Sequence, residues 1–131
     1  MHRSPFVVRA FVGALVLSAT ALAQGSDDCT TAQAIAGVGS FPFNNTTATT
    51  GTQGQSNATC LFFGSTAIQR DVWFTWTSNV TDQVELATCG TTMDSKVAVY
   101  AGSGCPTTPP IVCNDDSCGL QSRLNFAAVA G

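Results

Sequence analysis

Six cysteines constrain this chain more than any other feature of its sequence. All six lie after residue 23 of a 131-residue chain, at positions Cys29, Cys60, Cys89, Cys105, Cys113 and Cys118. An even number of cysteines in a small chain indicates a disulfide framework when folding takes place in an oxidising compartment. We therefore expect three disulfide bonds.

The N-terminus predicts that compartment. Arg3 and Arg9 give a basic start, residues 10–21 form an apolar run, and Ala21-Leu22-Ala23 is a small-x-small cleavage site. The run is shorter than the roughly 20 residues of a membrane-spanning helix, and no later segment is long and apolar enough to span. The pattern predicts a signal peptide over residues 1–23 and a secreted protein, extracellular or at the cell surface. A retained N-terminal anchor is the alternative.

Size and charge limit what the mature chain can do. Removal of the leader leaves 108 residues, which is enough for one small domain, at residues 24–131. Its basic residues are Arg70, Lys96 and Arg123, against eight acidic residues. This excess of negative charge, without a basic patch, argues against nucleic acid and anionic membrane as partners.

The disulfide connectivity is less constrained than the number of bonds. Six cysteines allow fifteen connectivities, and proximity along the chain is the available guide. On that basis we predict the pairs Cys29 with Cys60, Cys105 with Cys113, and Cys89 with Cys118. Zinc is the competing use of cysteine, but no C-x-x-C unit occurs and the compartment favours oxidation.

Short strand patterns alternate with turns along the whole mature chain. The strongest covers residues 71–78, in which Val72, Phe74 and Trp76 share one face. Further strands are expected after residue 41 and at residues 83–88, 96–100 and 120–129, separated by turns rich in glycine, proline or asparagine. No segment has the pattern of a long helix. Roughly five to seven short strands indicate an all-β sandwich or barrel.

Several motifs, in their order and spacing, resemble a known module. They are Asp28-Cys29 before an Ala/Ile segment, Asp71-Val72-Trp73-Phe74, Thr88-Cys89-Gly90, Met93-Asp94-Ser95 before Val97-x-Val99-Tyr100, and Cys113-Asn114-Asp115-Asp116 before Ser122-x-Leu124. Together they resemble the bacterial pre-peptidase C-terminal domain, in the cysteine-rich version of secreted planctomycete-type proteins. The resemblance covers residues 28–131.

This resemblance implies both a fold and a role. The fold would be a jelly-roll-like β-sandwich of short antiparallel strands, serving as a non-catalytic accessory or binding module within a larger extracellular protein. Some members resemble collagen- or carbohydrate-binding domains and carry calcium, so extracellular polysaccharide or a protein matrix is the partner class implied. The family also continues with another strand, which implies that the domain at residues 24–131 is C-terminally truncated.

Calcium is the cofactor for which the residues themselves offer candidate ligands. Calcium binds carboxylate, amide and backbone oxygens. The candidate ligands are Asp94, Asn114, Asp115, Asp116 and one of the pair Asp27 and Asp28. The alternative is that Asp115 and Asp116 diverge, one capping backbone amides and the other in solvent. The Asp-x-Asp-x-Asp spacing of a dedicated calcium loop is absent.

Aromatic residues offer a second kind of candidate site. Trp73 and Tyr100 could stack on sugar rings, because aromatic faces combine apolar area with a polar edge. Core packing is the alternative. Trp73 and Trp76 point to opposite faces of one strand, so only one of them is expected to be exposed.

The mature chain lacks residues that common catalytic sites require. The only histidine is His2, in the leader, so the mature chain cannot assemble a Ser-His-Asp or Cys-His site. Glycoside hydrolysis needs only two carboxylates, but most aspartates here adjoin turns, where aspartate usually caps amides. We predict that the protein is not an enzyme and retain a small secreted hydrolase as the third hypothesis.

Overall fold

The computed structural model describes residues 4–10 and 25–131. Its elements are eight strands and two 3₁₀ turns: β1 Ser4–Ala10, η1 Cys29–Thr31, β2 Gln33–Ala36, β3 Gly39–Phe43, η2 Ala58–Cys60, β4 Phe74–Thr77, β5 Asp82–Ala87, β6 Lys96–Val99, β7 Val112–Asp115 and β8 Arg123–Ala128. No α-helix occurs in these two ranges. The expected all-β class is confirmed.

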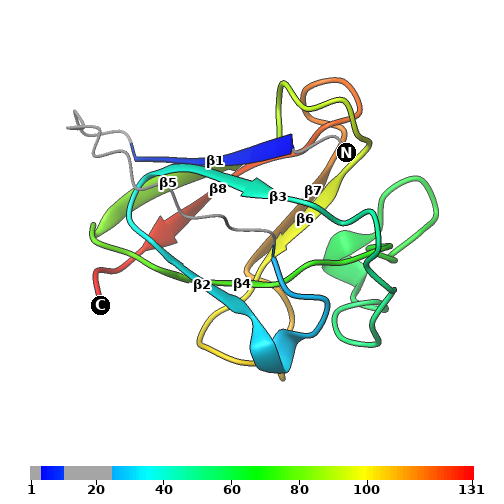
Figure 1. Cartoon of the computed structure of the whole chain (residues 1–131), viewed down its shortest axis with the longest axis horizontal. Helices are drawn as coiled ribbons and strands as arrows, with labels where there is room; N and C mark the ends of the chain where they lie inside the picture. The colour runs from blue at the N-terminus through cyan, green and yellow to red at the C-terminus, as the bar shows by residue number, and fades with distance from the viewer. Residues whose placement is uncertain (1–3, 11–24) are drawn as a thin grey trace.

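The strands form one larger sheet and two pairs. The larger sheet has the order β3-β1-β5-β8, and every neighbouring pair in it is antiparallel. β6 and β7 form an antiparallel pair, whereas β2 and β4 are parallel. β2 and β4 are joined through β3 and a long loop, so no hairpin forces them to be antiparallel. Figure 1 shows the larger sheet lying above the β2–β4 pair.

The core lies between the larger sheet and the β2–β4 pair. Its buried members are Val8, Ile35, Phe43, Val84 and Ala128, one each from β1, β2, β3, β5 and β8. Val72, Phe74 and Trp76 pack against them, which confirms the core-facing side expected for this strand. Alternation with period two puts these three residues on one face, and burial of that face fixes the register.

Some strand boundaries differ from the pattern. β4 is shorter than residues 71–78, and Trp73 makes only an isolated bridge with Ser26. β3 ends at Phe43, before the threonine-rich segment that continues the pattern. There the Asn44 side chain accepts a hydrogen bond from the Thr46 amide at 2.9 Å. Such local bonds offer the backbone an alternative to a strand ladder.

Three disulfides link the elements. Cys29 joins Cys105, Cys60 joins Cys113, and Cys89 joins Cys118. The Cys89–Cys118 pair is confirmed, but the predictions of Cys29 with Cys60 and of Cys105 with Cys113 are wrong. Proximity along the chain misled because each real partner is brought in by tertiary structure: η2, which carries Cys60, lies against β7, which carries Cys113.

β1 falls within the predicted signal peptide. It lies between β3 and β5, and Val8 is only 3% exposed. The rest of the predicted leader, residues 1–3 and 11–23, lies outside the described residues. The structure is that of the whole 131-residue chain, so β1 belongs to the form that still carries the leader.

Candidate functional site

A cleft of about 1020 Å³ is lined by β4 and β6. Within the described residues, β4 pairs with β2 and β6 pairs with β7, and the two strands are not paired with each other. Its walls carry several large side chains, among them Trp73, Trp76, Tyr100 and Phe126. The lining also includes Val8, Phe43 and Ala128, so this partly apolar space extends from the two small sheets to the larger sheet.

Trp73 and Tyr100 lie together in the wall of this cleft. Their ring centroids are 5.9 Å apart, with an interplanar angle of 36°. The indole Nε1–H of Trp73 donates to Asp71 Oδ2 at 2.6 Å, and Asp71 Oδ1 accepts from the Gly51 amide at 2.7 Å. Asp71 is only 6% exposed, so it holds the indole from a fixed position.

Trp76 also lines this space, but its side chain packs against the core cluster. Its ring meets that of Phe126 edge to face with centroids 5.9 Å apart, and its Nε1–H donates to the Gly37 carbonyl at 2.7 Å. Of the two tryptophans, Trp76 belongs to the core. This division matches the alternation expected from the sequence.

The Tyr100 hydroxyl is buried and has no hydrogen-bond partner among the described residues. Burial, followed by the negative charge of Asp71, raises the pKa of Tyr100. Tyr100 also lines a smaller cavity of about 270 Å³ formed by residues 54–57 and 106–109. The hydroxyl faces Gly54, so its missing partner is a cost to the fold and not a contact offered to a ligand.

Three predicted calcium ligands converge at a second place. The carboxylates of Asp94, Asp115 and Asp116 offer oxygens within 4.8 Å of one another. Asp115 ends β7, and Asp116 follows with a positive φ of 58°. The carboxylates of Asp115 and Asp116 therefore converge with that of Asp94, and the diverging arrangement is not the one observed.

Lys96 already supplies one positive charge to this cluster. Its Nζ lies 3.2 Å from Asp115 Oδ2, and the two side chains are 9% and 13% exposed. The ammonium also donates to the carbonyls of Ser65 at 3.0 Å and Cys60 at 3.4 Å. Lys96 is thus tethered to the η2 region and neutralises only part of the cluster.

Asp116 is the least compensated member of the cluster. Desolvation, Asp115 and Asp94 raise its pKa, and Lys96 opposes them. Its Oδ1 is buried without a hydrogen-bond partner among the described residues. Either a proton or a bound cation would relieve this carboxylate.

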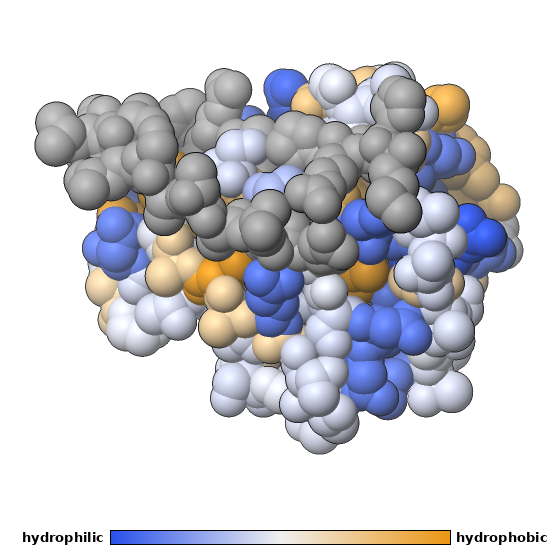
Figure 2. Space-filling model, in the orientation of Figure 1, coloured by the Kyte–Doolittle hydropathy of each residue, from blue (hydrophilic) through white to orange (hydrophobic). Residues whose placement is uncertain are grey.

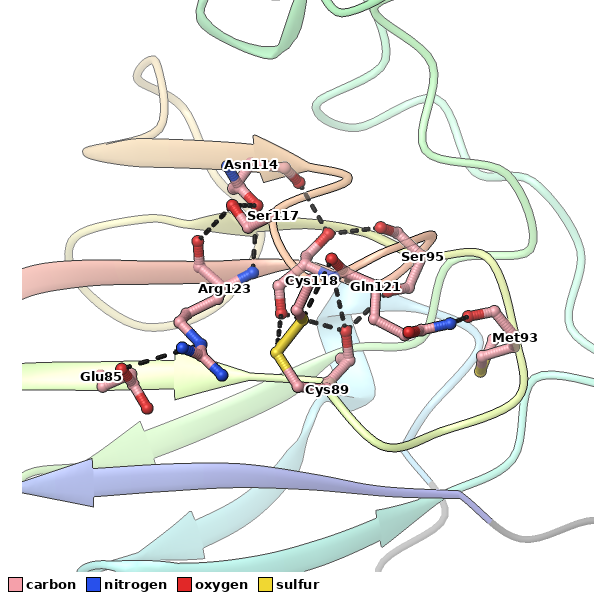
Figure 3. The surroundings of a disulfide bond; sticks show 11 residues. Glu85, Cys89, Met93, Ser95, Asn114, Ser117, Cys118, Gln121 and Arg123 are labelled. Carbon is pink, nitrogen blue, oxygen red and sulfur yellow. Dashed lines mark hydrogen bonds and ion pairs between the residues drawn. A yellow bond between two sulfur atoms is a disulfide. The ribbon is translucent and has the colours of Figure 1, made fainter.

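Asn114 and Asp28 make local hydrogen bonds. The Oδ1 atom of Asn114 accepts from Ser117 Oγ at 2.7 Å and from the Arg123 amide at 3.0 Å, as Figure 3 shows. Asp28 Oδ1 accepts from the Thr30 amide at 2.8 Å, which caps η1 and lowers the pKa of Asp28. Both residues act as local capping groups.

Asp27 is engaged elsewhere too. Its carboxylate accepts from the Thr49 amide at 2.6 Å and from the Thr49 hydroxyl at 2.9 Å. These bonds tie residue 27 to the segment that follows β3. The cation candidate is therefore reduced to three carboxylates.

Sequence reasoning missed the roles of Asp71 and Lys96. Asp71 stands two residues before Trp73, and this spacing places both side chains on one face of an extended segment. Lys96 stands two residues after Asp94, with the same consequence. The alternation of side chains along an extended segment was therefore the available signal in both cases. It does not identify a contact between residues that are distant in the sequence.

The face shown in Figure 2 has no continuous apolar surface that would be a further candidate site. Apolar residues there form separate patches between hydrophilic ones. Within residues 4–10 and 25–131, the structure has no helix with the length and apolar character needed to cross a membrane.

A scan against protein-family models, a search of curated proteins and a search of solved structures each found no match for this chain.

Proposed function

We propose that this protein is a secreted, non-catalytic binding or spacing module of the pre-peptidase C-terminal type, working within a larger extracellular protein. The observation that carries the proposal is the open cleft with Trp73 and Tyr100 in its wall. Three disulfides support it as well, because such bonds persist in oxidising compartments.

The cleft fits an extracellular polysaccharide or a protein matrix better than a charged ligand. An aromatic pair offers an apolar face for a sugar ring or a proline. Asp71 keeps the indole of Trp73 in place before a ligand arrives. Preorganisation of this kind reduces the entropy lost on binding.

A glycan and collagen array followed by calorimetry tests this function. We expect a ligand whose binding quenches or shifts tryptophan fluorescence. Trp73→Ala should abolish binding, and Tyr100→Ala should weaken it about tenfold by removing the second ring of the aromatic pair. Leu61→Ala, an exposed apolar residue outside the cleft lining, is the matched control and should bind normally. Binding that survives Trp73→Ala would contradict the assignment.

Calcium-dependent binding is a second candidate because the three carboxylates of Asp94, Asp115 and Asp116 converge. One bound cation at a hundredfold excess over its dissociation constant stabilises the fold by about 2.7 kcal/mol. A thermal melt with calcium and with chelator measures this effect. Asp115→Asn should remove it, whereas Asp82→Asn, outside the cluster, should not. An unchanged melting temperature at millimolar calcium would leave Lys96 as the only cation of the cluster.

A further inference from the structure

β1 is an interior strand of the larger sheet. Val8 lies opposite Gly39 of β3 on one side and opposite Leu86 of β5 on the other. Its side chain is a member of the core cluster that includes Phe43 and Val84. β1 is antiparallel to both neighbours, so β3 and β5 run in the same direction.

The same seven residues belong to the predicted leader. Neighbouring strands lie about 4.8 Å apart, so the two strands on either side of a removed strand lie about 10 Å apart, too far to pair. Cleavage after Ala23 would therefore leave β3 and β5 with unpaired backbone edges and a gap in the core at Val8. Unpaired edges of this kind are templates for pairing with another extended chain.

The N-terminal end of β1 is held by fewer backbone hydrogen bonds than the rest of the strand, which favours its exchange for another strand. Pro5 of β1 lies directly opposite Pro42 of β3 in the register. Proline has no N–H, so neither residue can donate to the ladder at this point. β5 pairs with Val7 to Ala10 only, so the proline end of β1 has no second neighbour to hold it.

The two flanking strands define what can occupy the gap. The occupant must be extended and antiparallel to both strands, with an apolar residue at the position of Val8. β3 carries no charged residue, whereas β5 places Glu85 opposite residue 9. A basic residue at that position is therefore favoured.

We propose that the gap between β3 and β5 is a strand-acceptor site, filled by Ser4–Ala10 before processing and by an extended segment of another polypeptide afterwards. The inference rests on the secretion step of the proposed function, and the gap adjoins the cleft, whose lining includes Val8. A second copy of the processed chain fits less well, because the strand it would have to offer is β3, which carries no basic residue to lie opposite Glu85 and includes Pro42, which cannot donate a backbone hydrogen bond.

The test starts from the full chain, with a protease site inserted at residues 20–23. The folded chain is cut and then mixed with a fluorescent peptide of sequence SPFVVRA, which is residues 4–10. We expect saturable uptake, with protection of the amides of Ser40, Phe41, Phe43 and residues 84–87 from hydrogen exchange. A peptide carrying Val8→Asp should bind at least about tenfold more weakly, because a carboxylate would be buried, and a scrambled peptide should not bind.

Two further measurements separate this site from the cleft and decide the outcome. Trp73→Ala should leave peptide uptake unchanged, so failure of the cleft assignment would not affect this result. A chain produced without residues 1–23 should bind the same peptide and gain thermal stability. Absence of uptake by both the cut and the leaderless chain, or equal uptake of the Val8→Asp peptide, would overturn the proposal.

Discussion

We expect the stability lost on removing each disulfide to depend on the size of the loop that it closes and on the burial of its cysteines. The bridges Cys29–Cys105, Cys60–Cys113 and Cys89–Cys118 span 76, 53 and 29 residues. Restriction of the unfolded chain by these loops corresponds to about 4.5, 4.2 and 3.6 kcal/mol at 25 °C. A domain of this size is stable by only about 5 to 15 kcal/mol, so each loss would be a large fraction of the total.

Two corrections apply to these magnitudes. The bridges interleave, first cysteine to fourth, second to fifth and third to sixth, so with two intact the third closes a smaller effective loop. The entropic figures are therefore upper values. Burial acts in the opposite direction for two of the bridges: Cys29, Cys60 and Cys113 are 1%, 0% and 8% exposed, and replacing a buried cysteine with alanine leaves a void that costs about 1 kcal/mol.

The prediction is therefore that the Cys89→Ala/Cys118→Ala variant loses the least stability and the Cys60→Ala/Cys113→Ala variant loses more. Urea unfolding of the three double variants, followed by fluorescence, gives the free energies. The slope of each transition must be compared as well, because an open loop expands the unfolded chain. A Cys89→Ala/Cys118→Ala variant that is the least stable of the three would refute the reasoning from loop size and burial.

Three other measurements test the geometry of the cleft and the acidic cluster. Gly54→Ala should destabilise more than Gly104→Ala, because both have φ near +75° but only the Cβ at Gly54 would collide with the Tyr100 hydroxyl; equal urea midpoints would contradict this. Asp71→Ala leaves two buried donors unpaired and should cost about 2 to 4 kcal/mol, whereas Asp71→Asn keeps one acceptor and should cost less; equal free energies of unfolding would contradict this. Asp116→Asn should stabilise the calcium-free fold at neutral pH, since an acid whose pKa is raised by folding weakens the fold while it is ionised. That gain should vanish as pH falls below 3.8, the ordinary pKa of aspartate, and a gain that persists in acid would contradict it.

Strand positions in the core were readable from the sequence because they depend on local alternation. Val84 and Leu86 of β5, and Leu124, Phe126 and Ala128 of β8, are spaced by two, and burial of one face follows from that spacing. The number of disulfides was equally accessible, since it depends only on the even count and the compartment.

Disulfide partners were not readable, because they depend on which loops meet in space. Cys105 and Cys113 are close along the chain, yet each bonds to a cysteine in a distant 3₁₀ turn. The same limit explains the acidic cluster. Asp94 meets Asp115 because β6 pairs with β7, and no local pattern predicts that register.

Two of the disulfides hold the loops that line the cavity beside Tyr100. Among the described residues the core cluster contains only five buried members, and a small core alone contributes little stability. Cys105 immediately precedes the proline-rich segment at residues 106–109, and Cys60 follows the loop at residues 54–57; together these segments line the cavity beside Tyr100. The Cys29–Cys105 and Cys60–Cys113 bridges therefore hold the two loops that form the wall of this smaller cavity. A cleft kept open by covalent bonds loses little entropy when a ligand enters it, which favours binding without a folding step.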